Sequence, residues 1–153
     1  MPQASSDTPT SSSIVEALQA WFRTCPRLTS GAKVGVDWLP DEPLEYAIYA
    51  TPTTIRTREN VLGEEVPLDI QTQNFIFASK ERFGADIGQN LNNQAFYESI
   101  IAWIWEQNER RNLPQIPNGT VKSIVPTLTA FIAEAGADTA RYQIQLKLTY
   151  RRL

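Results

Sequence analysis

Few residues of this chain could carry out catalysis or hold a metal ion. The 153 residues include no histidine, so the commonest general base and the commonest zinc ligand are missing. The single cysteine, Cys25, has no histidine to activate it, so we expect a buried and unreactive thiol. The adjacent acids Asp41–Glu42 and Glu64–Glu65 lie in predicted loops, whereas acid–base catalysis needs opposed groups in a cleft. We therefore expect no enzyme, no cofactor and no metal site.

The composition is that of one globular domain. Apolar residues make up 42% of the chain, which is enough for a core, and the net charge is −3. An acidic chain is a poor candidate for specific nucleic-acid binding, which uses a basic surface. No apolar run is long enough to cross a membrane, and the N-terminus lacks the blocks of a signal peptide. We expect a protein that is made and folded in a cytoplasm.

The run from Arg141 to Arg151 predicts the longest and clearest strand. Apolar and polar residues alternate along it without a break, which gives a strand one buried face and one wet face. Before it, Ser123–Ala133 predicts a strand with Val125, Thr127, Thr129 and Phe131 on one face. Pro126 removes a backbone donor, so that strand should lie at an edge or contain a bulge.

Two amphipathic helices are predicted. The first begins at Ser13, where Ser13 and Glu16 match a capping box, and it ends at Cys25–Pro26. The second runs from about Asn93 to Arg111, and its apolar stripe is wider than a simple surface helix needs. A stripe of this width suggests packing on a sheet and on a neighbouring subunit.

A long hairpin is predicted in the middle of the chain. Short strands cover Val34–Leu39 and Pro43–Pro52, and a third extended run, Thr53–Glu59, leads to a tip at Asn60–Gly63. The return begins at Glu64 and continues to Ala78, and its length suggests that the arms extend beyond the sheet. Val61 and Leu62 lie at the tip, where exposed apolar side chains would form a docking element. The alternative is that the tip folds back onto its own domain.

The element order is helix, three or four strands, helix, two strands. This order predicts an α+β fold, with a mixed, mostly antiparallel sheet of about five strands and both helices packed on one face. Residues 1–12 are rich in Ser, Thr and Pro and predict a disordered tail. We expect residues 13–153 to form a single domain. Candidate residues for an assembly interface are Arg56, Arg58, Val61, Leu62 and Arg141, because dispersed arginines of this kind usually lie on surfaces or interfaces.

Three stretches of the chain resemble a family of phage proteins. They are Phe75–Gly84, Phe96–Glu109 and Ala137–Tyr150, and the closing string DTARYQIQLKLTY is the most specific of them. Together they are similar to the tail terminator-like proteins, often called minor capsid or tail completion proteins, of phages and prophages of Gram-positive bacteria. The resemblance covers most of the chain from Ser13 to Arg152. None of the three stretches is an active-site motif.

The resemblance implies a structural protein of the virion, located at the tail or neck. Subunits of that family form a ring, typically hexameric, that caps the tail tube and joins it to the head, and they can stay monomeric when free. The implied partners are further copies of the chain, the tail tube protein and the head-completion protein, without membrane or specific nucleic-acid binding. Two alternatives remain open: a head-completion or other minor capsid protein, and a protein-binding adaptor domain.

Overall fold

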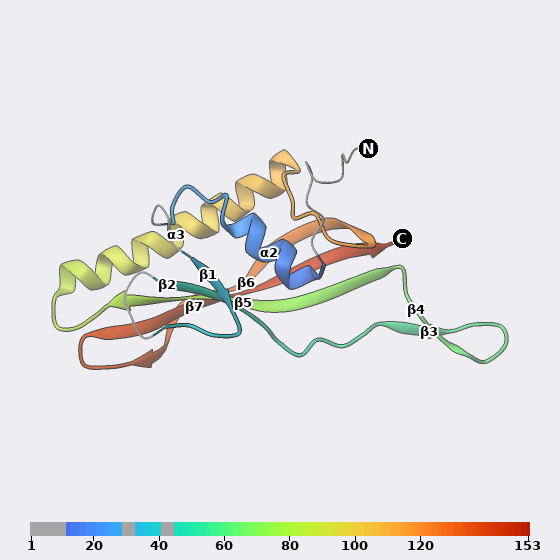
Figure 1. The fold of residues 1–153 in the computed structure, drawn as a ribbon, viewed down its shortest axis with the longest axis horizontal. Helices are drawn as coiled ribbons and strands as arrows, with labels where there is room; N and C mark the ends of the chain where they lie inside the picture. The colour runs from blue at the N-terminus through green and yellow to red at the C-terminus, as the bar shows by residue number, and fades with distance from the viewer. Residues whose placement is uncertain (1–11, 29–32, 41–44) are drawn as a thin grey trace.

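The computed structural model describes residues 12–28, 33–40 and 45–153 (Figure 1). A five-stranded sheet in the order β1-β2-β5-β7-β6 forms its centre, and a separate two-stranded sheet pairs β3 with β4. Strands β1 and β2 are parallel, and every other pair is antiparallel. The predicted α+β fold with a mixed, mostly antiparallel sheet is therefore confirmed. The elements are α2 (Ile14–Phe22), β1 (Val34–Val36), β2 (Glu45–Ala50), β3 (Thr57–Glu59), β4 (Glu65–Pro67), β5 (Ile70–Arg82), α3 (Ile87–Arg110), β6 (Gly119–Ala135) and β7 (Thr139–Arg152).

Strands β5 and β7 form the centre of the sheet and pair along their whole length. Their register runs from Ile70 opposite Arg151 to Arg82 opposite Thr139. The predicted alternation of β7 is confirmed, because Tyr142, Ile144, Leu146 and Leu148 are all buried. The opposite face is less wet than predicted, since Gln143 on that face is buried as well.

Strand β6 lies at the predicted edge position, but bulges interrupt its predicted alternation. It lies at one edge of the sheet, and its pairing with β7 shifts register between Pro126 and Leu128, as a proline in a strand suggested. The next shift follows between Leu128 and Phe131, and two more lie between Val121 and Ser123 and between Ile132 and Glu134. Each extra residue of a bulge moves the following side chains to the other face. The register still places Val125 opposite Lys147 and Phe131 opposite Gln143, which share one face of β7, so the predicted common face holds for these two residues. The simple alternation predicted through Thr127 and Thr129 does not hold, because two of the bulges lie between Val125 and Phe131.

Several predicted boundaries also move. Helix α3 begins at Ile87, six residues before the predicted start, because the Asp86 carboxylate caps it by accepting the Gly88 and Gln89 amides. The return arm is divided into β4 and β5, so five strands precede α3 instead of three or four. The predicted tail up to Ser11 and the acid pair Asp41–Glu42 lie outside the described residues.

Aromatic rings join both helices to the sheet. Phe22 of α2 stacks on Phe77 of β5 with ring centroids 4.6 Å apart, and Tyr97 of α3 meets the same Phe77 ring edge-on at 6.4 Å. Trp21 and Trp103 join the two helices, with centroids 4.6 Å apart. Because both helices contact one side chain of β5, they lie over the same face of the sheet, as Figure 1 shows.

The lone cysteine belongs to this core. Cys25 is buried, and burial raises the pKa of its thiol, while backbone hydrogen bonds from Arg27 and Leu28 act in the opposite direction. A raised pKa keeps the group a neutral thiol, which packs as a small apolar side chain. The prediction of a buried cysteine is confirmed.

A small polar cluster lies inside the core, where α3 crosses the sheet. The Tyr97 hydroxyl lies 2.6 Å from the Ser79 hydroxyl and donates to the Tyr142 carbonyl at 3.1 Å. Glu81 is buried close by, and its Oε2 atom has no hydrogen-bond partner among the described residues. Burial raises the pKa of the Glu81 carboxyl, and the Ser79 hydroxyl lowers it by a smaller amount.

We predict that Glu81→Gln raises the unfolding temperature at neutral pH. The folded protein binds the Glu81 proton more tightly than the unfolded chain does, so stability from this group is present at low pH and is lost as pH rises through the folded-state pKa. The gain from the substitution should therefore shrink as pH falls towards the ordinary carboxyl value of 4.5. Thermal unfolding across this pH range measures it, with Glu98→Gln on the exposed surface of α3 as the control. A gain that did not change with pH would contradict the prediction.

Candidate functional site: a projecting hairpin

The hairpin formed by β3 and β4 extends away from the rest of the molecule (Figure 1). Three residue pairs join its strands, from Thr57 opposite Pro67 to Glu59 opposite Glu65. Such a short two-stranded sheet is marginal by itself, so its two ends must supply order. We call residues 59–65 the hairpin tip.

Asn60 organises the tip. Its side-chain oxygen accepts the Leu62 amide at 2.9 Å and the Glu64 amide at 3.0 Å, and its backbone carbonyl accepts the Gly63 amide at 3.0 Å. Gly63 has a φ of +82°, which a glycine adopts without strain. A turn followed by a left-handed glycine is a common hairpin ending. The tip is thus a closed turn that presents its two central residues, Val61 and Leu62, outward.

The exposure of the tip decides between the two predictions made for it. Val61 is fully exposed and Leu62 is 79% exposed, so the tip does not fold back onto its own domain. Glu59 and Glu64–Glu65 flank the two aliphatic residues in the sequence, Glu59 is the register partner of Glu65, and all three acids are exposed. The tip therefore combines an apolar centre with three negative charges.

Gln71 fixes the other end of the hairpin. Its amide nitrogen donates to the Arg56 carbonyl at 2.7 Å and to the Leu68 carbonyl at 2.9 Å, and its oxygen accepts the Arg56 amide at 3.0 Å. The Gln71 side chain is buried, and Gln71 belongs to β5, so it ties both arms to the main sheet. A second tie comes from β7, where the Arg152 amide donates to the Asp69 carbonyl at 2.7 Å.

A hollow of about 400 Å³ lies at the base of the hairpin, and we call it the root hollow. Arg56 and Arg58 line it from one arm, and Leu68, Asp69 and Ile70 line it from the other. Both arginines are exposed, whereas Leu68 and Ile70 are half-buried. The hollow therefore combines apolar and positively charged walls.

The structure brings four of the five candidate interface residues together. Arg56, Arg58, Val61 and Leu62 all belong to the hairpin, but Arg141 does not. Its guanidinium lies 4.4 Å from the centre of the Tyr49 ring, and its register partner is Lys80, close to the end of β5 opposite the hairpin. At about 3.3 Å per residue, Arg141 lies roughly 30 Å along the sheet from the hairpin base. The sequence placed Asn60 in the predicted tip at Asn60–Gly63 without giving its side chain a role, and it gave no indication of Gln71.

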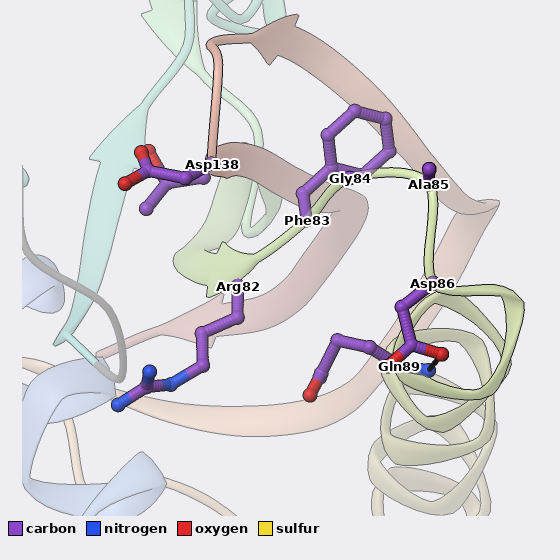
Figure 2. Close-up of a pocket in the computed structure, with 8 residues that line it drawn as sticks. Arg82, Phe83, Gly84, Ala85, Asp86, Gln89 and Asp138 are labelled. Atoms are coloured by element: carbon purple, nitrogen blue, oxygen red, sulfur yellow. Dashed lines mark hydrogen bonds between the residues drawn. The ribbon is translucent and has the colours of Figure 1, made fainter.

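A second hollow, of about 460 Å³, lies at the far end of the sheet (Figure 2). Asp86 and Gln89 line it from the start of α3, Asp138 lines it from the β6–β7 turn, and Arg82 belongs to β5. Figure 2 shows the Arg82 guanidinium pointing away from both acids. The Asp86 carboxylate is already engaged as the helix cap. These side chains do not converge on a point where a substrate atom could react.

Two further properties of the described residues bear on the kind of site present. Within them, no group of three or more His, Cys, Asp or Glu residues is placed to hold a metal ion. In the same part of the chain, no helix combines the length and the apolar character that crossing a membrane requires.

The comparisons with known proteins give no match, either to a protein-family model or to a curated protein. The candidate site is therefore identified from the geometry of this chain alone. Among the described residues, the hairpin is the feature that combines exposed apolar side chains, concentrated charge and a fixed backbone.

We predict that Gln71→Leu destabilises the base of the hairpin. The change removes the side-chain partner of the Arg56 amide and of the Arg56 and Leu68 carbonyls, and each lost hydrogen bond contributes about 0.5–1.5 kcal/mol. Urea unfolding should show this loss, and amide exchange of residues 56–68 should accelerate while that of α3 stays the same. The control is Gln94→Leu, because Gln94 is exposed on α3. Unchanged exchange in the hairpin would show that Gln71 does not hold it.

Proposed function

We propose that this chain is a structural protein of a phage virion, a tail terminator or completion protein that caps the tail tube as a ring and joins it to the head. The observation that carries the proposal is the projecting hairpin, whose ordered tip exposes Val61 and Leu62 to solvent. Exposed aliphatic side chains on a fixed projection favour a protein-binding role, because a monomer gains nothing from them. Further support comes from the resemblance of Phe75–Gly84, Phe96–Glu109 and Ala137–Tyr150 to the tail terminator-like proteins.

The rest of the molecule is compatible with a ring subunit. A ring needs two different contact surfaces on every copy, since head-to-tail contacts close a ring only if the surfaces differ. The hairpin supplies one projecting surface, and the exposed apolar residues of β6, Leu128 and Ile132, belong to another part of the molecule. The net charge of −3 suits a protein that lies beside a path for DNA, because an acidic protein does not bind the DNA phosphates tightly. A head-completion protein or an adaptor domain would also need an exposed docking element.

The proposal predicts that the double change Val61→Ser and Leu62→Ser abolishes capping without unfolding the protein. Both side chains are exposed, so stability should stay within about 0.5 kcal/mol of the original. Electron microscopy of tails assembled with the original protein should show tails of uniform length joined to heads. Tails assembled with the variant should be of uncontrolled length or remain separate from heads.

The control is the double change Ile87→Ser and Leu91→Ser, which removes two exposed aliphatic side chains from the start of α3 instead. This control should leave capping intact. If tails assembled without the protein had normal length and joined heads as usual, the proposed terminator function would be contradicted. A protein-binding adaptor would then be the better explanation.

A further inference from the structure

The root hollow is a preformed cavity with a defined chemistry. Leu68 and Ile70 supply half-buried apolar walls, and Arg56 and Arg58 supply exposed cations. Asp69 contributes one negative charge, and Arg151, the register partner of Ile70, adds a third cation beside it. Because Gln71 fixes the backbone of Arg56 and Leu68, the opposite walls hold their spacing before any partner arrives.

The hairpin tip has the complementary chemistry. Val61 and Leu62 are the apolar counterpart of Leu68 and Ile70, and the three exposed carboxylates of the tip are opposite in charge to the arginines of the root hollow. Charged groups of opposite sign around an apolar centre are the usual arrangement of a specific protein interface. The two surfaces therefore fit one another in both charge and polarity.

The tip of a hairpin cannot reach the root hollow of its own chain. The three residue pairs between β3 and β4 separate the two surfaces, and the bonds of Asn60 and Gln71 hold the two ends in place. Any tip that fills a root hollow must therefore come from another molecule.

We infer that the hairpin tip of one copy docks in the root hollow of a second copy of this chain. The inference rests on the proposed function, because only an assembling protein needs such a contact. It assigns the apolar pair Val61 and Leu62 to the interior of the contact and Arg56 and Arg58 to its charged border. It also gives the contact two different surfaces, so successive copies can join without a second kind of partner.

Charge reversal of the two surfaces tests the inference. One variant carries Glu64→Arg and Glu65→Arg in the tip, and the other carries Arg56→Glu and Arg58→Glu in the root hollow. Each variant alone sets like charges against each other, so its self-association should be at least tenfold weaker than that of the original protein. An equal mixture restores opposite charges in both pairings, so mixed oligomers should form. Sedimentation velocity at low salt, with one variant fluorescently labelled, measures both effects.

The matched control reverses charges elsewhere. Glu98→Arg with Glu109→Arg on α3, and Arg23→Glu with Arg27→Glu near α2, change the net charge by the same amounts at exposed positions. These variants should associate as the original protein does. If the two hairpin variants do not associate when mixed at about millimolar concentration, or if each alone associates like the original, the inference is wrong.

Cross-linking shows the contact directly. A mixture of Leu62→Cys and Leu68→Cys variants, joined by a short bismaleimide, should give a dimer that contains one copy of each variant. Equal yields of Leu62→Cys dimers formed from that variant alone would overturn the tip-to-hollow pairing. Failure of this inference and failure of the proposed function give different results. If no mixed dimer forms but the protein caps tails normally, the inference is wrong and the proposed function stands. If the mixed dimer forms but the protein does not cap tails, the proposed function alone is contradicted.

Discussion

The hydrogen bonds of the Gln71 side chain are the interaction on which the proposed role depends. A two-stranded hairpin with three residue pairs has too little buried surface to hold its own direction in water. Gln71 fixes both arms to the central sheet, because it belongs to β5 and its side chain forms hydrogen bonds with the backbone of each arm. Asn60 then closes the far end with bonds that need no packing at all. The result is a projection whose apolar tip is held out in solvent by polar contacts.

The central sheet can support such a projection because β5 and β7 are long and fully paired. The aromatic side chains of Phe22, Phe77 and Tyr97 fix both helices to one face of it, so the hairpin extends from a rigid base. Order at the base matters for binding, since a partner that meets a fixed tip does not have to pay for ordering it. The arrangement leaves the apolar side chains of the tip exposed to water, and exposed apolar surface of this kind usually marks a site that binds another protein.

Much of the fold could be predicted from the sequence, because strong alternation identified β7 and the prolines and glycines marked the turns. The start of α3 was harder to see, since the polar residues between Gln89 and Asn93 conceal its first turns. The alternation predicted for β6 failed between Val125 and Phe131, because bulges depend on the pairing with β7, which only the three-dimensional structure determines. Gln71 could not be distinguished from other polar strand residues, because its role depends on two carbonyls that are distant in the chain from one another.

The most direct test of a rigid hairpin that serves assembly is a cryo-electron microscopy map of tails capped by this protein. We expect a ring at the tail end in which every hairpin remains extended from its sheet and its tip is buried against a neighbouring copy. A ring whose hairpin tips lie free in solvent, or tails that carry no ring, would contradict the account.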